Sequence, residues 1–211
     1  MPQPDPVIAI VDDDPSAREG LSSLIRSSGL QVETFASAQE FLARPGWQTP
    51  SCLVLDLQLP GLSGLDLQKR MAEVGLGIPI VFLTGHGNIP ASVQAMKAGA
   101  VEFLTKPFDD EELLRAIQEA IERDRRTRQE LANTLELRSR YESLTAREKE
   151  IMQQVVSGRL NKQIAAELTI TEFTVKIHRG RVMRKMDADS LPDLVRMAEN
   201  LGIRSPRPAR T

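Results

Sequence analysis

Short apolar segments alternate with amphipathic segments over the first 120 residues, and this alternation constrains the fold more than any other feature of the sequence. The apolar segments lie at residues 7–11, 31–35, 52–55, 80–83 and 101–104, and segments with helical spacing lie at 16–26, 38–43, 65–74, 91–98 and 111–123. Strands that alternate with helices are typical of a parallel sheet covered on both faces. We therefore predict a doubly wound (βα)₅ domain of the α/β class at residues 1–122.

The rest of the chain lacks strand signals and is predicted to be helical. Residues 123–143 are highly charged and contain no Pro or Gly, which favours a solvated helical linker, with a short coiled coil as the alternative. Residues 144–203 contain four short helical segments, the first opened by a capping box of Thr145 and Glu148. We predict a four-helix, all-α domain there and a disordered tail at residues 204–211.

The formal net charge of −2 hides an uneven distribution of charge along the chain. Residues 1–122 carry 17 acidic and 8 basic side chains, whereas residues 123–211 carry 12 acidic and 19 basic side chains. A basic half joined to an acidic half favours a nucleic-acid partner for the basic half. Two ordinary solvated surfaces would give the same numbers, so charge alone leaves both interpretations open.

The cellular setting is predicted from features that the sequence lacks. No run of 18 apolar residues could span a membrane, and the first residues lack the basic and apolar regions of a secretory signal. The single cysteine, Cys52, excludes a disulfide framework and a thiolate metal site. We expect a cytoplasmic protein with no membrane partner.

Side chains that can carry chemistry follow four of the five predicted strands. In chain order they are Asp12, Asp13, Asp14, Asp56, Thr84 and Lys106. The carboxyl ends of parallel strands meet at one edge of a sheet, so we expect these groups to lie together. Clustered carboxylates repel one another, and a hard divalent cation such as Mg²⁺ or Mn²⁺ would compensate them. The ammonium of Lys106 and the hydroxyl of Thr84 could hold the oxygens of a phosphoryl group.

These residues lie in stretches that resemble the receiver domain of two-component response regulators. The matching stretches, between Val7 and Arg123, are IVDDD, LVLDLQLPGLSGLDL, IPIVFLTGHG and AMKAGAVEFLTKPF. The resemblance implies that Asp56 is the phosphoacceptor, which receives a phosphoryl group from a partner sensor histidine kinase. It also implies a Mg²⁺ or Mn²⁺ site made by Asp12, Asp13, Asp56 and the backbone carbonyl of Gln58.

The same resemblance gives roles to residues around the phosphoacceptor. Lys106 would pair with the phosphoryl group, and the peptide bond before Pro107 would be cis. Thr84 would be the switch hydroxyl, and Phe103 the aromatic side chain that moves with it. Gln58 and His86 would tune the lifetime of the phosphorylated form. The chain would catalyse only its own phosphorylation and dephosphorylation, and would not be an enzyme with external turnover.

In the basic half, two helical segments at 162–168 and 171–186 have the spacing of a helix-turn-helix, whose second helix enters the major groove of DNA. Val175, Val182 and Met186 recur at helical spacing and are predicted to face the core. The stretch LTAREKEIMQQVVSGRLNKQIAAELTITEFTVKIHRGRVMRKM resembles the LuxR-type DNA-binding domain. Both halves together resemble the NarL/FixJ family of response regulators, and in wording the FixJ, StyR and TodT group.

This second resemblance implies how the chain contacts double-stranded promoter DNA. Lys176, Ile177 and Arg179 would read bases. Phosphate contacts are expected from Lys162, Thr171, Thr174, Arg181 and Lys185. The helix at 190–201 would form a homodimer after phosphorylation, and the dimer would activate transcription with RNA polymerase. Gly180 departs from the family, which commonly has Ala or Lys there, so operator specificity does not transfer by analogy.

Two other functions remain open at this point. Haloacid-dehalogenase-type phosphatases also place a nucleophilic Asp after a parallel strand, with a second Asp two residues later as general acid. Gln58 stands two residues after Asp56 and cannot donate a proton in this way, although Asp14 does follow Asp12 at that spacing. Alternatively, the first domain is only a dimerisation module, and the chain binds DNA without being phosphorylated.

Overall fold

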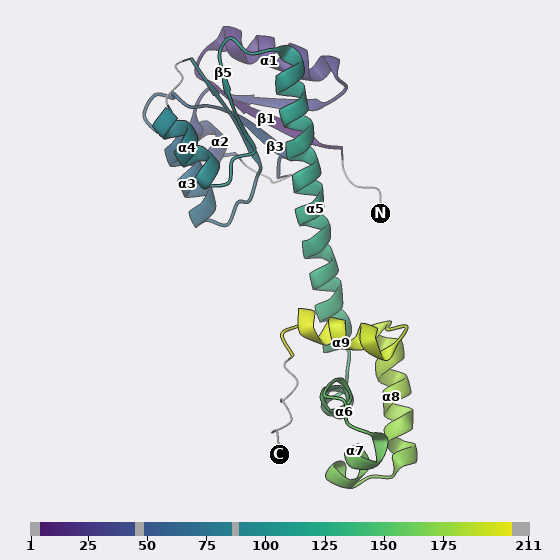
Figure 1. Ribbon diagram of the computed structural model, residues 1–211. Helices are drawn as coiled ribbons and strands as arrows, with labels where there is room; N and C mark the ends of the chain where they lie inside the picture. The colour runs from purple at the N-terminus through teal and green to yellow at the C-terminus, as the bar shows by residue number, and fades with distance from the viewer. Residues whose placement is uncertain (1–4, 45–48, 86–88, 204–211) are drawn as a thin grey trace. The chain divides into compact units, whose positions relative to one another are not determined.

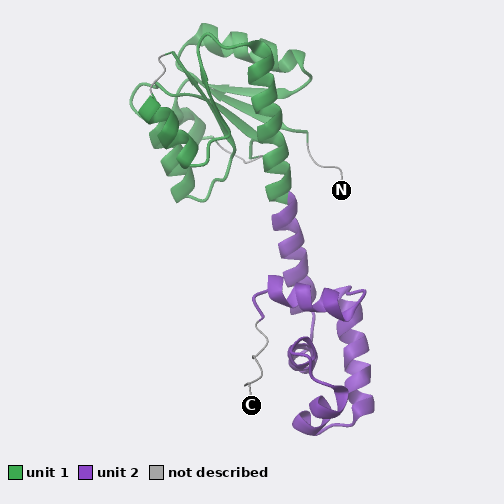
Figure 2. Ribbon diagram, viewed as in Figure 1, with its two compact units in different colours: residues 1–128 green, residues 129–211 purple. Residues whose placement is uncertain are grey.

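The structure is a computed structural model that describes residues 5–44, 49–85 and 89–203. The chain divides into two compact units, Met1–Arg128 and Gln129–Thr211, coloured green and purple in Figure 2. The predicted disordered tail at residues 204–211 lies outside the described residues.

A five-stranded parallel sheet forms the centre of the first unit (Figure 1). Its strands are β1 (Val7–Val11), β2 (Gln31–Phe35), β3 (Cys52–Asp56), β4 (Ile80–Thr84) and β5 (Glu102–Thr105). They lie in the order β2-β1-β3-β4-β5, and every neighbouring pair is parallel. The chain reverses its direction of travel across the sheet between β1 and β3, which is where such folds form a ligand crevice. The predicted doubly wound α/β fold is confirmed.

Helices cover both faces of this sheet, as Figure 1 shows. Their bounds are α1 (Pro15–Ser27), α2 (Ala38–Leu42), α3 (Gly64–Glu73), α4 (Ile89–Lys97) and α5 (Asp110–Glu142). Along β1, Ile8 and Ile10 pack into the core under α1 and α5, whereas Ala9 and Val11 pack into the core under α2, α3 and α4. Burial on both faces explains why the three central strands, β1, β3 and β4, consist almost entirely of apolar residues.

Helix α5 is longer than its counterpart in the sequence prediction. It comprises 33 residues and includes the predicted last helix at 111–123 and, up to Glu142, the predicted linker at 123–143. No Pro or Gly interrupts this stretch, so its backbone hydrogen bonds continue without a break. None of the helices within the described ranges is both long and apolar enough to cross a membrane.

Four further helices follow α5 in the described part of the second unit, residues 129–203. They are α6 (Ala146–Val156), α7 (Asn161–Leu168), α8 (Glu172–Met186) and α9 (Leu191–Asn200). The capping box of Thr145 and Glu148 opens α6, and Thr171 and Ser190 cap α8 and α9. Val175, Val182 and Met186 are buried in a common core, as their helical spacing predicted. The all-α fold of this unit is confirmed.

Candidate functional site

Acidic side chains gather where β1 and β3 end. In the sheet, Val11 pairs with Leu55, so that Asp12 and Asp56 follow on neighbouring strands. Carboxylate oxygens of Asp12, Asp13 and Asp56 all lie within 4.8 Å of one another. Asp12 is 1% exposed and Asp56 is 9% exposed, whereas Asp13 is open to solvent. The predicted clustering at the sheet edge is confirmed for these three carboxylates, and an oxygen-only donor set of this kind fits a hard divalent cation. Asp14, which was predicted to lie with them, instead caps α1 by accepting a hydrogen bond from the Ser16 amide at 2.8 Å.

Lys106, just after β5, bridges two of these carboxylates. Its Nζ donates hydrogen bonds to Asp12 Oδ2 at 2.8 Å and to Asp56 Oδ2 at 2.9 Å. Partial burial by itself would lower the pKa of Lys106, but the bonds to the two carboxylates outweigh burial and raise it. The Lys106 amide also donates to the Thr84 carbonyl at 2.7 Å, and the peptide bond to Pro107 is cis, as predicted.

Backbone groups hold the two buried carboxylates from the other side. Asp56 Oδ1 accepts a hydrogen bond from the Gln58 amide, and Asp12 Oδ1 accepts one from the Asp14 amide, each at 2.9 Å. Arg18, on α1, donates to the Asp12 carbonyl at 2.7 Å. Arg18 gave no signal in the sequence, because an arginine on an amphipathic helix is ordinary until its partner is known. The loops after β1 and β3 are therefore held in place around the carboxylates.

Gly64, the first residue of α3, is a second contributor that sequence reasoning missed. A Cβ atom at this position would lie 2.6 Å from the Asp56 carbonyl oxygen and 3.1 Å from the ring of Phe82. Real Cβ atoms do not approach a backbone oxygen so closely, so any other residue here would force α3 or the end of β3 to shift. The motif LPGLSGLDL could have given this signal, since its second glycine follows Asp56 by eight residues.

The remaining predicted site residues lie on β4 and β5. Thr84 ends β4 and is fully buried. Phe103 on β5 is half-buried, and its ring centroid lies 6.1 Å from that of Phe82 on the neighbouring strand. His86, which was predicted to tune the phosphoryl lifetime, lies outside the described residues. Thr84 therefore lies at the same edge as the carboxylates, one strand from Asp56, and Phe103 lies on the next strand beyond Thr84.

In the second unit, helices α7 and α8 form the predicted helix-turn-helix. Lys162 on α7 and Lys176, Ile177 and Arg181 on α8 are exposed. The hydroxyl of Thr171 caps α8 by accepting a hydrogen bond from the Thr174 amide at 3.1 Å. Exposed lysine and arginine side chains along the second helix match what a groove-binding helix presents to DNA.

Comparison with known families now identifies the chain. A model of response regulator receiver domains matches residues 8–118, and a model of the luxR family of bacterial regulatory proteins matches residues 142–198. The chain is a response regulator. Its receiver and LuxR-type domains imply transcription regulation within a two-component system, with a histidine kinase and DNA as partners. This assignment favours the receiver interpretation of the acidic site over a dehalogenase-type phosphatase.

Individual relatives resemble this response regulator over most of their length. It is 53% identical to nodulation protein W of Bradyrhizobium diazoefficiens, over 93% of this chain and 87% of that protein. It is 50% identical to response regulator protein TodT of Pseudomonas putida, over 92% of this chain and 86% of that protein. A low-resolution structure of response regulator StyR matches with a TM-score of 0.83 at 47% identity, covering 92% of this chain and 98% of that one.

Two predicted DNA-contacting residues of this response regulator have partners within their own domain. Arg179 donates to Asn161 Oδ1 at 2.7 Å. Lys185 donates to Glu148 Oε2 at 2.7 Å and to the Ser143 carbonyl at 3.1 Å. The Lys185 bond, together with bonds from Thr145, lowers the pKa of the buried Glu148 carboxyl to about 2, although burial opposes this shift. The Lys185 charge is thus already used to neutralise a buried carboxylate.

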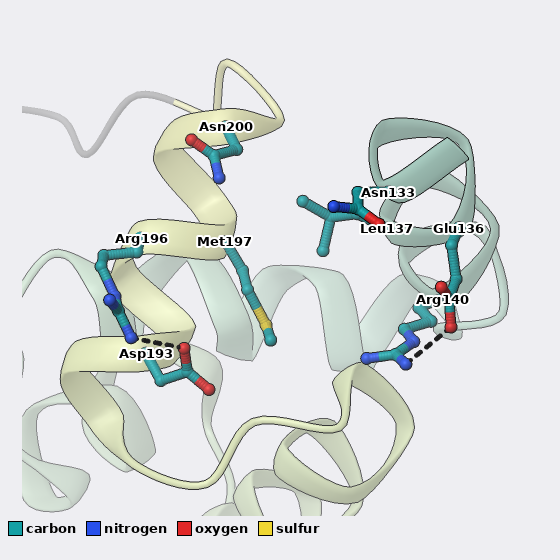
Figure 3. Close-up of a pocket in the computed structure, with 8 residues that line it drawn as sticks. All are labelled: Asn133, Glu136, Leu137, Arg140, Asp193, Arg196, Met197 and Asn200. Carbon is teal, nitrogen blue, oxygen red and sulfur yellow. Dashed lines mark hydrogen bonds and ion pairs between the residues drawn. The ribbon is translucent and has the colours of Figure 1, made fainter. Parts of the chain in front are cut away.

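A groove of about 410 Å³ separates α9 from the last turns of α5 in the second unit (Figure 3). Its charged side chains are paired with one another: Arg196 with Asp193 at 2.9 Å, and Arg140 with Glu136 at 2.8 Å. Figure 3 shows these pairs at opposite walls, with the Met197 side chain pointing into the space between. The four charged side chains that line the groove are therefore compensated within it.

Proposed function

We propose that Asp56 accepts a phosphoryl group from a phosphohistidine of a sensor kinase, and that the phosphorylated protein binds promoter DNA as a homodimer and activates transcription. The observation that carries the proposal is the setting of Asp56. Its carboxylate ends β3 at the sheet crevice, between the Gln58 amide at 2.9 Å and the Lys106 ammonium at 2.9 Å. Two more carboxylates stand beside it. This is the arrangement of a nucleophile within a charge-compensating site.

The residues that would hold Mg²⁺ or Mn²⁺ are Asp12, Asp13, Asp56 and the backbone carbonyl of Gln58. The donor set consists of oxygens alone, and the exposed Asp13 leaves the cluster open to solvent on one side. When bound, the cation supplies positive charge that neutralises the oxygens of the incoming phosphoryl group. The single ammonium of Lys106 cannot neutralise three carboxylates and a phosphoryl group by itself, so the site fits a further cation.

In the reaction, a carboxylate oxygen of Asp56 attacks the phosphorus of the phosphohistidine. The phosphorus–nitrogen bond breaks, its electron pair stays on the imidazole nitrogen, and that nitrogen takes up a proton. The product is an acyl phosphate, which water later hydrolyses to inorganic phosphate and the free carboxylate. Lys106 holds a phosphoryl oxygen throughout. Gln58 and His86 tune access of that water, and the chain turns over no other substrate.

The conformational response is carried by Thr84 and Phe103. The phosphoryl group adds acceptor oxygens at the edge where β4 ends, and the Thr84 hydroxyl moves to donate to one of them. Phe103 then repacks toward the space that Thr84 leaves. The half-buried position of Phe103 beside Phe82 supports this step, because a ring at the rim of the core can repack with little loss of burial. The surface of α4 and β5 changes as a result.

DNA recognition is assigned to the exposed face of α8 and its surroundings. Lys176, Ile177 and Arg179 read bases, and the phosphate contacts come from Lys162, Thr171, Thr174, Arg181 and Lys185. Arg179 and Lys185 make these contacts with the N–H donors that their bonds within the domain leave over. Support comes from the exposure of Lys162, Lys176 and Arg181, which leaves their charges available to phosphates. The homodimer forms through α9, and the DNA-bound dimer contacts RNA polymerase.

The test is labelling of the full chain by radioactive acetyl phosphate in the presence of Mg²⁺. We expect Asp56→Asn to abolish labelling, and the matched variant Asp110→Asn, at an exposed position at the start of α5, to label normally. Persistent labelling of Asp56→Asn would contradict the assignment. Beryllofluoride should raise both the dimer fraction and the affinity for DNA; an unchanged response would favour a receiver that serves only as a dimerisation module.

A further inference from the structure

The recognition helix α8 carries apolar side chains on its outer face as well as on its buried face. Phe173 is 72% exposed and Ile177 is 41% exposed. They are four residues apart and therefore neighbours on the helix surface, one turn from each other. The core of the domain is served by the opposite face, where Val175 and Val182 are buried. The two exposed side chains thus form an apolar pair that packing within the domain does not explain.

The side chains beside this apolar pair indicate what kind of partner it could bind. Lys176 lies beside Ile177 on the exposed face, and Arg181 follows; neither side chain makes a hydrogen bond or ion pair with any other residue that the structure describes. At Gly180, one turn further, an added Cβ would meet nothing within 4 Å, so that position is open as well. An apolar pair flanked by unpaired cations complements a polyanion that also displays apolar groups. Duplex DNA has this character in its major groove.

We propose that Phe173, together with Ile177, recognises the 5-methyl groups of thymines in the operator, an inference that rests on the proposed DNA binding. Phe173 is the second residue of α8, and the first residues of a recognition helix are those that contact base edges. The thymine methyl is the apolar group that base pairs display in the major groove. Phenylalanine has no hydrogen-bonding group, so the methyl is the feature by which it distinguishes one base pair from another.

The experiment replaces thymine by deoxyuridine, which removes the methyl and leaves every hydrogen-bonding group in place. Full-length protein activated by beryllofluoride first selects sites from a random duplex library. Each thymine of the selected site is then replaced singly, and the dissociation constant is measured. At the contacted thymines we expect wild type to bind about fourfold more weakly, the factor for one lost methyl-sized contact. At a thymine that Phe173 contacts, the Phe173→Ala variant should bind the thymine and deoxyuridine duplexes equally, whereas the effect at a thymine that Ile177 contacts should remain.

Controls separate this contact from folding and from general DNA affinity. Leu135→Ala, which truncates an exposed apolar side chain on α5, should keep the full thymine effect. Phe173→Ala should keep the wild-type salt dependence on random-sequence DNA, because that dependence reports phosphate contacts. Wild type that is indifferent to deoxyuridine, or a Phe173→Ala variant that keeps the full effect at every contacted thymine, would overturn the inference. Failure to select any sequence would overturn the proposed DNA recognition itself, and the inference with it.

Discussion

Two lysines hold buried carboxylates in this response regulator, one in each unit. Lys106 donates to Asp12 and Asp56 at 2.8 and 2.9 Å, and Lys185 donates to Glu148 at 2.7 Å. The contacts are alike, but the balance of charge differs. Lys185 and Glu148 neutralise each other, whereas Lys106 faces two carboxylates with a third, Asp13, close by. A neutral pair stabilises the fold. A surplus of carboxylates, by contrast, can bind a cation, which in turn can neutralise a phosphoryl group.

The largest expected effect comes from replacing each lysine by methionine. Each variant leaves at least one buried carboxylate without its lysine partner. We expect the free energy of unfolding to fall by about 2–4 kcal/mol in both variants. Only Lys106→Met should be rescued by 10 mM Mg²⁺, because Glu148 belongs to no group of three possible metal ligands among the residues that the structure describes. The rescue is measured by denaturant unfolding with and without Mg²⁺, and hydrogen exchange in peptides of each unit reports which unit is stabilised. Equal rescue of both variants would remove the distinction between the two sites.

The two ion pairs should lose their contribution to stability at opposite ends of the pH scale. The pKa of Glu148 is lowered from 4.5 to about 2, so its stabilisation is complete above pH 4.5 and is lost as the pH falls toward 2. The loss should be on the order of 2 kcal/mol. The pKa of Lys106 is raised, so its stabilisation is present below 10.5 and is lost as the pH rises through the higher folded value.

Hydrogen exchange in α6 peptides across the acid range checks the first of these losses, and Glu148→Gln provides the control because it cannot titrate. If wild type and Glu148→Gln lose protection of α6 in parallel between pH 4.5 and 2, the stabilising role of the Lys185 pair is wrong.

The smallest expected effect comes from Gly64→Ala, which alters the position of Asp56 without changing any charge. The added methyl overlaps the Asp56 carbonyl, so α3 or the end of β3 must shift, at about 1–2 kcal/mol of stability. The activation free energy of labelling by acetyl phosphate should rise by more than the free energy of unfolding falls, because the reactivity of a nucleophile depends on its orientation. Gly77→Ala is the control, since a Cβ there meets nothing within 4 Å. Equal labelling rates would show that Asp56 tolerates displacement.

Much of the fold was predictable because its signals are local. The strand segments, the capping box of Thr145 and Glu148, and the caps at Thr171 and Ser190 follow from hydrophobic periodicity and from hydrogen bonds between near neighbours in the chain. The carboxylate cluster was predictable too, because parallel strands carry their ends to one edge. The roles of its residues stay predictions until Asp56 is labelled.

What the sequence by itself determined, then, is which elements form and which charges lie at the sheet edge. The tertiary structure alone decided which partner each charged group meets. Lys185 bonds to Glu148, which is 37 residues away in the chain, and Gly64 leaves room for the Asp56 carbonyl. Neither contact follows from composition or periodicity. Phe173 likewise reads as one more apolar helix residue until its exposure is known. The physical reason is that burial and ion pairing depend on packing between elements, whereas helix and strand formation depends mainly on neighbours along the chain.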